Sequence, residues 1–382
     1  MDKSVLSIPS DSTVLHNLKQ CRFKIYTKEL EGQVTSFVTH DNKLLISLIG
    51  KGILVFSILE GKCQFLQQLH HTGTSPKSLA DCKDTNITCY QMSISAKYLV
   101  YIKDKLGKLT VCMHKFADIL DGSLTVKKEL DILRQAPMVI DHELDLLCIE
   151  INESCLRSVD LETMEVVKTW KVVKNAVYLL RVQRTDDHNM IGVADSRSGL
   201  SVYDLRQEDR QQYVCLYQVP VEEIRNFHLV GNFVAVFHKF QPNVTFWNMK
   251  EQKTILCINI QDQMRELVEE FLDVEEEEDC SLCEKDDNQV TSVTSLQSDD
   301  DHLLIYGTKS GCIFGMSVNK RLKLFNIPCP QLPTSTSHAV QGLDYMAGGL
   351  LAVVYEKGNL AVMDFSLEDP PEGPFTRNQT RS

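Results

Sequence analysis

Apolar and polar positions follow one another in a unit that recurs along most of the chain. In residues 189–206, NMIGVADSRSGLSVYDLR, an apolar run leads into a polar, glycine-containing turn and then into a second apolar run. Short runs with β-branched residues on both sides of such a turn are typical of a β-hairpin. Similar units occupy residues 43–58, 97–113, 144–161, 232–249, 302–318 and 349–365. The pattern therefore predicts seven β-hairpins.

The hairpins recur at a nearly constant interval. Their first apolar runs begin near Leu44, Tyr98, Leu144, Met190, Phe233, Leu303 and Leu350, so the intervals are 54, 46, 46, 43, 70 and 47 residues. A period of about 40 to 50 residues is that of β-propeller blades. Strand-like runs such as QVTSFV, QVTSVTSL and AVQGLDYM precede the hairpins, and another run follows each of the first six. Four strands in seven copies predict an all-β chain, a seven-bladed β-propeller.

The seventh hairpin has no fourth strand after it. The chain continues into SLEDPPEGPFTRNQTRS, whose composition predicts a disordered tail over 367–382. An unattached strand-like run, CRFKIYT (21–27), precedes the first hairpin. We therefore predict that this N-terminal strand closes the seventh blade, so that the propeller spans 21–366 after an N-terminal segment, 1–20. Two β domains divided near residues 261–289 are the alternative, which the even spacing disfavours.

This architecture resembles the WD-repeat family over residues of about 20–366. The family's signature is Gly-His at the start of a blade and Trp-Asp at the end of its third strand. No Gly-His pair is present in this chain. The second position carries Tyr203-Asp204, Trp247-Asn248, Val159-Asp160 and Met363-Asp364. The family's Asp-His-Ser/Thr-Trp hydrogen-bond network is therefore expected to be largely absent, with apolar packing between blades stabilising the ring instead.

A long acidic insertion separates the fifth hairpin from the sixth. Residues 261–289 hold thirteen Asp or Glu and two Lys or Arg, a net charge of −11 within a total of −12. Met264, Leu267, Val268, Phe271 and Leu272 have the spacing of one apolar stripe on a helix. The insertion is therefore expected to be partly helical. It either packs on its own propeller before a disordered acidic loop, or docks into a partner whose basic surface the acids attract.

The end of the fourth hairpin carries a second candidate contact. Within the WD-repeat family, a Trp-Asp-x-Arg ending resembles the box of cullin-4 ubiquitin ligase substrate receptors, whose Arg faces the ligase's propeller adaptor. Here Tyr203 replaces the Trp, while Asp204 and Arg206 match, and an adjoining blade has no clear second copy. The resemblance implies that these three residues bind a partner. The alternative is a structural ending in which Asp tightens the turn and Arg is solvated.

Catalytic and metal-binding motifs are not found in the sequence. It contains no Walker-type loop, G-x-G-x-x-G, G-x-S-x-G or H-E-x-x-H. Cys280 and Cys283 form a C-x-x-C pair, but a structural zinc site needs four ligands and the chain has no second pair. His70-His71 is interpreted as part of a loop, and DHELD (141–145) as a solvated turn. We predict a chain that is not an enzyme and needs no metal or cofactor.

Composition bounds the class of protein. The 382 residues are 43% hydrophobic and 24% charged, as in soluble globular proteins. The longest apolar runs are far shorter than a membrane span, and the N-terminus, MDKSVLSIPSDS, resembles no targeting peptide. The thirteen cysteines are odd in number and lie mostly in apolar runs, as at Cys112, Cys148, Cys215 and Cys257. They predict buried free thiols in a reducing compartment.

The functional hypothesis is a non-enzymatic scaffold for protein–protein interaction. The acidic chain is a poor general binder of nucleic acid, since phosphate contacts need clustered Lys and Arg. Its expected partners are proteins of a larger intracellular complex, cytoplasmic and/or nuclear. One alternative is a cullin-4 substrate receptor that uses Asp204 and Arg206. Another is a non-catalytic subunit of an enzyme, for instance in RNA modification. All three rest on analogy with other propellers, because a fold alone does not settle function.

Overall fold

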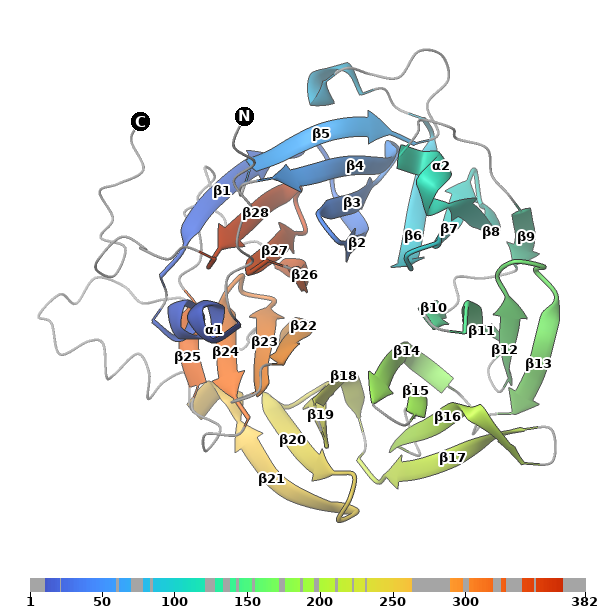
Figure 1. The fold of residues 1–382 in the computed structure, drawn as a ribbon, viewed down its shortest axis with the longest axis vertical. Coiled ribbons are helices and arrows are strands. Elements are labelled where there is room, and N and C mark those ends of the chain that lie inside the picture. Colours follow the sequence, from blue (N-terminus) through green and yellow to red (C-terminus); the bar gives the residue numbers. More distant parts are fainter. Residues whose placement is uncertain are drawn as a thin grey trace, which may run out of the picture.

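The computed structural model describes most of the chain. The described residues are 11–20, 22–59, 62–69, 78–82, 85–120, 128–132, 138–141, 144–152, 155–171, 176–185, 188–195, 199–209, 212–221, 223–230, 232–262, 289–297, 302–318, 324–327, 339–346 and 348–366. Within them, strands β1 to β28 form seven sheets of four antiparallel strands each. The sheets stand as blades around a central axis (Figure 1). The predicted seven-bladed β-propeller is confirmed.

The blades follow one another along the chain, and we letter their strands a to d from the axis outward. Blades one to four comprise β2 (Val34–His40), β3 (Lys43–Leu48), β4 (Gly52–Leu59), β5 (Lys62–Gln68); β6 (Ile87–Ile94), β7 (Tyr98–Lys105), β8 (Lys108–Lys115), β9 (Lys128–Ile132); β10 (Met138–Asp141), β11 (Leu146–Asn152), β12 (Cys155–Asp160), β13 (Val166–Lys171); β14 (Ala176–Thr185), β15 (His188–Asp195), β16 (Gly199–Asp209), β17 (Gln212–Val219). Blades five to seven comprise β18 (Ile224–Val230), β19 (Phe233–His238), β20 (Asn243–Asn248), β21 (Lys253–Asn259); β22 (Val290–Gln297), β23 (His302–Thr308), β24 (Ile313–Ser317), β25 (Leu324–Ile327); β26 (Val340–Met346), β27 (Leu350–Tyr355), β28 (Asn359–Asp364), β1 (Lys24–Glu29).

The N-terminal strand closes the ring. β1 is strand d of blade seven and pairs antiparallel with β28, from Lys24 opposite Asp364 to Glu29 opposite Asn359. Blade seven thus combines residues from the beginning and the end of the propeller, which lie side by side in Figure 1. The strand begins three residues later than the predicted run at 21–27.

A helix before the closing strand is a feature that the sequence pattern did not predict. Helix α1 (Asp11–Lys19) buries Val14, Leu15 and Leu18, which join a cluster of apolar side chains from blades six and seven. Asn17 Nδ2 donates to the backbone oxygen of Phe365, 2.8 Å away, at the end of β28. Helix α1 of the N-terminal segment therefore helps to close the ring. Two shorter helices, η1 (Leu79–Asp81) and α2 (Phe116–Leu120), lie in blade connections.

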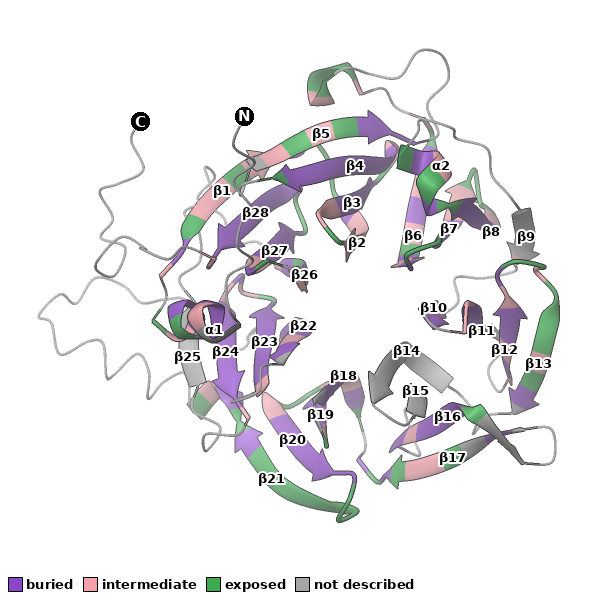
Figure 2. Cartoon of the chain, in the orientation of Figure 1, coloured by how far each residue is buried: buried purple, intermediate pink, exposed green. Residues whose placement is uncertain are grey.

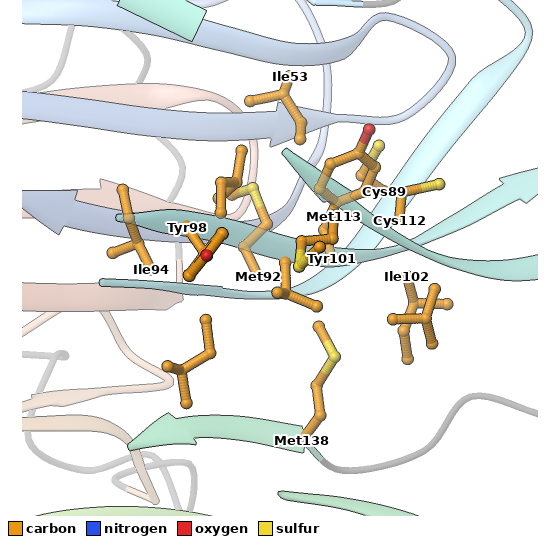
Figure 3. Packing of buried hydrophobic residues seen from close by; sticks show 14 of the residues in the cluster. Ile53, Cys89, Met92, Ile94, Tyr98, Tyr101, Ile102, Cys112, Met113 and Met138 are labelled. Atoms are coloured by element: carbon orange, nitrogen blue, oxygen red, sulfur yellow. The ribbon is translucent and has the colours of Figure 1, made fainter. Parts of the chain in front are cut away.

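Apolar side chains pack between neighbouring blades around the ring, as expected. Strands b and c are covered by a neighbouring blade on each face, so they read as continuous apolar runs; β3 and β4 are buried along nearly their whole length. Outer strands are different: β21 is exposed at six of its seven positions (Figure 2). Each cluster of buried side chains joins adjacent blades. In the largest, β4, β6, β7, β8 and β10 contribute side chains that meet between blades one, two and three (Figure 3).

Three glycines let blades approach closely. A Cβ at Gly342 of β26 would lie 2.0 Å from the Phe37 ring of blade one. At Gly307 it would lie 2.4 Å from Val340 of blade seven, and at Gly192 2.4 Å from the Phe227 ring of blade five. Side chains of the following blade occupy the space that a larger residue would need. These positions therefore add steric fit to the apolar packing.

The prediction that the cysteines are buried is only partly right. Cys89, Cys112 and Cys148 are buried, and none of the nine cysteines within the described ranges forms a disulfide. Cys215 and Cys257, predicted to be buried, are exposed. They lie on β17 and β21, strands d of their blades, where no further strand covers the sheet. Apolar neighbours in sequence do not distinguish such an outer strand from an inner one.

This difference in exposure predicts selective alkylation. Iodoacetamide at mildly alkaline pH should label Cys257 and Cys215 in the folded protein, and Cys89 and Cys148 only after unfolding. Burial raises the pKa of the Cys89 and Cys148 thiols, so little reactive thiolate forms. Burial also keeps the reagent away from both sulfur atoms. Desolvation also raises the pKa of Cys215, which slows its reaction without blocking the reagent. Peptide mass spectrometry determines the order in which the cysteines are alkylated. Early labelling of Cys148 would contradict the buried position.

Candidate functional site

The two faces of the propeller carry different turns. Because the strands of a blade are antiparallel, the a–b and c–d turns lie at one end of the blade, and the b–c turns and d–a connections at the other. We call these the bottom and top faces. Arg206 lies in the c–d region of blade four, where β16 (Gly199–Asp209) leads to β17, and therefore on the bottom face. The insertion at 261–289 follows strand d of blade five and precedes strand a of blade six in the chain.

Asp204 has a structural role at the end of its strand. Its side chain is buried, and Oδ1 accepts a hydrogen bond from the backbone N of Arg206, 2.9 Å away. The equivalent residues of other blades make the same two-residue or three-residue turn: Asn248 to Lys250 (2.8 Å), Asp364 to Ser366 (2.9 Å) and Asp160 to Thr163 (2.7 Å). Asp and Asn favour this local bond to the following backbone. The Trp-Asp position thus keeps its acid or amide because it shapes the turn.

Tyr203 is part of the packing between blades three and four. It is buried in one cluster with Cys148, Trp170 and Tyr213. Within that cluster Trp170 of β13 meets the Tyr213 ring edge-on, with 4.7 Å between centroids. Burial raises the pKa of the Tyr203 phenol, in keeping with an apolar environment. Tyr203 therefore replaces the family's Trp as a packing residue and offers little surface to a partner.

Arg206 is the member of the predicted trio that is exposed. The structure thus brings Tyr203, Asp204 and Arg206 together as one strand end, with the first two as its support. Blade five repeats the arrangement with Trp247, Asn248 and the exposed Lys250. Sequence analysis found no clear second copy in an adjoining blade, because Asn and Lys replace Asp and Arg there. The hydrogen bond of Asn248 shows that the two endings, which occupy the same position in the sequence pattern, also form equivalent turns.

The apolar stripe of the insertion, Met264, Leu267, Val268, Phe271 and Leu272, lies outside the described residues. So do Cys280 and Cys283. The chain is helical at the last residues before this segment, 260–262. Asn259 Oδ1 accepts from the backbone N of Gln261 (2.9 Å) and Asp262 (3.2 Å), the bonds of a helix N-cap. An Asn five residues before Met264 is a start signal that the sequence interpretation missed.

Hydroxyl groups near the axis join neighbouring blades, and the sequence interpretation missed them too. In three places a serine on strand a of one blade accepts from the backbone of strand a of the next: Met92 N to Ser36 Oγ (3.0 Å), Ile140 N to Ser93 Oγ (3.0 Å) and Leu343 N to Ser292 Oγ (2.9 Å). Such bonds connect strands a of neighbouring blades directly. Ring stability here is therefore not due to apolar packing alone.

The repeated tetrapeptide Gln-Val-Thr-Ser marks two of these links. It opens strand a of blade one (33–36) and of blade six (289–292). Thr35 Oγ1 donates to the Cys89 oxygen of blade two (2.6 Å), and Thr291 Oγ1 donates to the Val340 oxygen of blade seven (2.5 Å). The same sequence thus makes the same inter-blade bond twice. Self-comparison of the sequence is the signal that could have found it.

Asp344 connects three blades around the closure. It lies half-buried on β26 of blade seven. Thr39 Oγ1 of blade one donates to its Oδ2 (2.6 Å), and Thr294 Oγ1 of blade six donates to its Oδ1 (3.0 Å). Bonds to an ionised carboxylate are stronger than those between neutral groups. The two oxygens of this single carboxylate therefore join blades six, seven and one.

Titratable side chains in the interior occupy structural positions. Tyr101 Oη and His114 Nε2, both buried in blade two, lie 2.8 Å apart. In the segment 141–145, predicted to be a solvated turn, the described acids have partners: Asp141 is buried and accepts from the Leu144 N (2.8 Å), and Asp145 pairs with Lys97. Across the described ranges, no group of three His, Cys, Asp or Glu is placed to hold a metal ion. A helix long and apolar enough to cross a membrane is also missing from those ranges.

Comparison with known proteins shows the fold. No protein-family model and no curated protein sequence matches the chain. Among solved structures 1594 chains match. One is the "Structure of U3-55K", with a TM-score of 0.60 and 13% identity, covering 88% of this chain and 98% of that chain. Another is the "Crystal structure of RRP9 WD40 repeats", with a TM-score of 0.61 and 13% identity, covering 89% and 99%. At this identity the likeness establishes a WD40-type propeller and no particular activity.

Proposed function

We propose that this chain, a propeller of the WD40 type, is a non-catalytic subunit that holds other proteins together in a complex. The observation that supports this best is the division of roles within the fold. Interior side chains are used in packing and in bonds between blades, while the exposed turns carry the distinctive residues. Among these are Arg206 on the bottom face and Leu106 and Phe240 on the top.

The interior arrangement favours a scaffold over an enzyme. Catalytic groups need a shared site in which a substrate can reach them. The buried Tyr101 and His114 are bonded to each other, and the half-buried Asp344 is bonded to Thr39 and Thr294. The first pair joins β7 and β8 within blade two, and the bonds of Asp344 join blades six, seven and one. The proposal includes a place in the cytoplasm, the nucleus or both, in keeping with the many cysteines.

A cullin-4 substrate receptor is the second candidate function, and the exposure of Arg206 favours it. An Arg that contacts a ligase adaptor must project from the bottom face, and Arg206 does so from a turn fixed by Asp204. Lys250 of blade five projects from the corresponding turn, fixed by Asn248. The two side chains differ in chemistry and share their backbone setting, so Lys250→Ala is a matched control for Arg206→Ala.

Affinity purification of the tagged chain from its own cells tests both functions. We expect a stable, stoichiometric set of partner proteins that remains with Arg206→Ala and with Lys250→Ala. Neither substitution should change the free energy of unfolding by more than about 0.5 kcal/mol, because both side chains are exposed. Quantitative mass spectrometry and thermal unfolding provide the readouts. A chain that elutes from size-exclusion chromatography as a monomer without stoichiometric partners would overturn the scaffold.

If the chain is a cullin-4 substrate receptor, the same experiment has a different expected result. Cullin-4 and its propeller adaptor should accompany the wild type and the Lys250→Ala variant, and should be lost from Arg206→Ala alone. A third variant lacking residues 263–288 separates the two predicted contacts. If it loses partners that Arg206→Ala retains, the acidic insertion is a docking element. If it loses none, the insertion does not hold the complex.

A further inference from the structure

We propose that the b–c turns of blades one and two form a docking surface for an acidic segment of a partner protein that carries an apolar side chain. This surface, which we call the blade 1–2 tip, comprises Ile49, Lys51, Lys103, Lys105, Leu106 and Lys108. The inference rests on the proposed scaffold function and names one of its contact surfaces and the chemistry of the partner.

Leu106 stands at the tip of blade two in a conformation that leucine disfavours. It is 89% exposed. Residues 105 and 108 pair across a two-residue loop in which Leu106 has φ 56° and Gly107 φ 84°. Positive φ at both positions describes a type I′ turn, in which Asn-Gly and Asp-Gly are favoured. A bulky apolar residue here costs conformational energy and leaves its side chain in water. Local rules broken without an evident gain in stability are expected at functional positions.

Ile49 provides a second apolar side chain on the same face of the neighbouring blade. It lies in the b–c turn of blade one and is 49% exposed. Gly50 in this turn accepts from the backbone N of Thr85 (2.7 Å) and donates to Thr88 Oγ1 (3.2 Å), at the start of blade two. The turn is thereby fixed against the blade that carries Leu106.

The backbone connects the two turns without an intervening element. Lys51 forms an isolated parallel bridge with Ile87 of β6, and Ile87 stands opposite Lys105 in the pairing of β6 with β7. Residues 51, 87 and 105 therefore follow one another across the top of blades one and two. A partner segment that lies along this line meets Ile49 and Leu106 together.

Charge favours an acidic partner. The blade 1–2 tip has four lysines, in a chain with a net charge of −12. The described acids near it include Glu31, Asp104 and Asp81, whose charge, like that of Lys51, acts on the Cys82 thiol. Glu31 pairs with Lys51 at 3.4 Å, and Asp104 Oδ1 accepts from the Gly107 N (2.9 Å), which holds the turn. Lysines around a weakly hydrated anchor attract acidic chains and set their register, while the anchor supplies contact area.

An acidic protein segment fits this surface better than a nucleic acid does. Nucleic acids are bound by lysine and arginine on phosphates and by exposed aromatic rings on bases. The blade 1–2 tip offers exposed aliphatic side chains, those of Ile49 and Leu106. These have no complement on a phosphate backbone, whereas Leu or Phe of a peptide packs on them.

Substitution of Leu106 by asparagine separates binding from folding. Asn is favoured in a type I′ turn, so Leu106→Asn should retain or raise the thermal midpoint while removing the anchor. Leu59→Asn is the matched control, because Leu59 is also an exposed leucine of the chain (56%) and lies in the c–d turn of blade one, on the opposite face. Lys105→Glu with Lys108→Glu tests the charge, with Lys250→Glu and Lys253→Glu of blade five as its control.

The probe is a displayed library of short random peptides, selected on the full-length chain. We expect enriched peptides that combine Asp or Glu with Leu or Phe. Their affinity, measured by fluorescence polarisation, should fall at least about tenfold with Leu106→Asn, a loss of the size that burial of one leucine gives. It should fall similarly with the lysine reversals, decrease with added salt, and stay unchanged in both controls.

Several results would overturn the proposal. These are the absence of enriched acidic peptides, equal binding by Leu106→Asn, or equal loss in Leu59→Asn. A short single-stranded RNA is the second probe: binding that needs the lysines and ignores Leu106→Asn would assign the surface to nucleic acid instead. Failure of the proposed docking surface can be distinguished from failure of the scaffold function. If the purified complex of the wild type persists in Leu106→Asn and no acidic peptide is selected, the scaffold stands and the blade 1–2 tip is not its docking surface.

Discussion

Removal of residues 1–30 is expected to prevent the chain from folding as a monomeric propeller. The deletion takes away strand d of blade seven and leaves the edge of β28 without its partner. It also removes the buried side chains of Val14, Leu15, Leu18, Phe23 and Leu30. At about 1.5–3 kcal/mol for each fully buried apolar side chain, the loss is on the order of 10 kcal/mol. The whole stability of a domain is about 5–15 kcal/mol.

Circular dichroism and size-exclusion chromatography of the truncated chain provide the measurement. We expect aggregation, or association through the open edge of blade seven, in place of a monomer with a cooperative thermal transition. Deletion of residues 367–382, which the sequence predicts to be a tail, is the control and should leave the transition unchanged. A peptide of residues 11–30 added in trans should restore part of it. A truncated monomer with the thermal midpoint of the full chain would contradict the role of the closure.

Much of the architecture could be predicted from the sequence because it repeats. The hairpin unit encodes strands b and c of each blade, and these are the strands that neighbouring blades bury on both faces. The closing strand followed from counting, since seven hairpins had six outer runs after them and one run before. Helix α1 was missed, because a nine-residue helix with three buried apolar side chains has too short a pattern to stand out.

Burial of individual side chains was less predictable. An apolar run does not reveal whether it forms a middle strand or the outer strand of a blade, and so Cys215 and Cys257 were wrongly assigned to the interior. The acids of 141–145 were taken as solvated, although Asp141 is buried and shapes the turn. The first error concerns the position of a strand within its blade, which an apolar run does not disclose. The second concerns a local turn, in which the acid accepts from the backbone three residues later.

The predicted partner-binding residues stay a prediction, and the structure shows what supports one group of them. Tyr203, Asp204 and Arg206 come together, but two of the three serve the fold. The sequence did not single out the exposed Leu106, because its unfavourable conformation is a positive backbone φ. The presence of an apolar residue in a hairpin does not indicate the sign of φ. The serine and threonine links near the axis also depend on which strands are neighbours. Sequence comparison within the chain, as with Gln-Val-Thr-Ser, would have revealed some of them.

Ring closure in this propeller relies on contacts concentrated at blade seven. Gly342 admits the Phe37 ring of blade one, and Thr291 and Ser292 of blade six bond to strand a of blade seven. Asp344 spans blades six, seven and one. A propeller whose last blade is completed by its first strand must hold that blade from both sides. These links add to the pairing of β1 with β28, in which a strand from the other end of the propeller completes blade seven.

Replacement of Asp344 by alanine is accordingly expected to lower the free energy of unfolding by about 2–3 kcal/mol, since it removes two hydrogen bonds to a carboxylate from a half-buried position. The effect exceeds that of a surface acid, because Thr39 and Thr294 lose their shared acceptor. Chemical denaturation measures it. Glu29→Ala, an exposed acid of β1, is the control and should change the free energy by no more than about 0.5 kcal/mol.

Double-mutant cycles assign the loss to the bridge itself. Asp344→Ala is combined with Thr39→Val and, separately, with Thr294→Val, and each pair should show a coupling of about 1 kcal/mol or more. Thr294 Oγ1 also lies 3.3 Å from the backbone N of Tyr345, from which it accepts, so Thr294→Val should cost more alone than its coupling with Asp344 accounts for. Coupling near zero in both cycles would mean that Asp344 stabilises its own blade only. In that case the closure between blades six, seven and one would depend on apolar packing and on the serine and threonine links to the backbone.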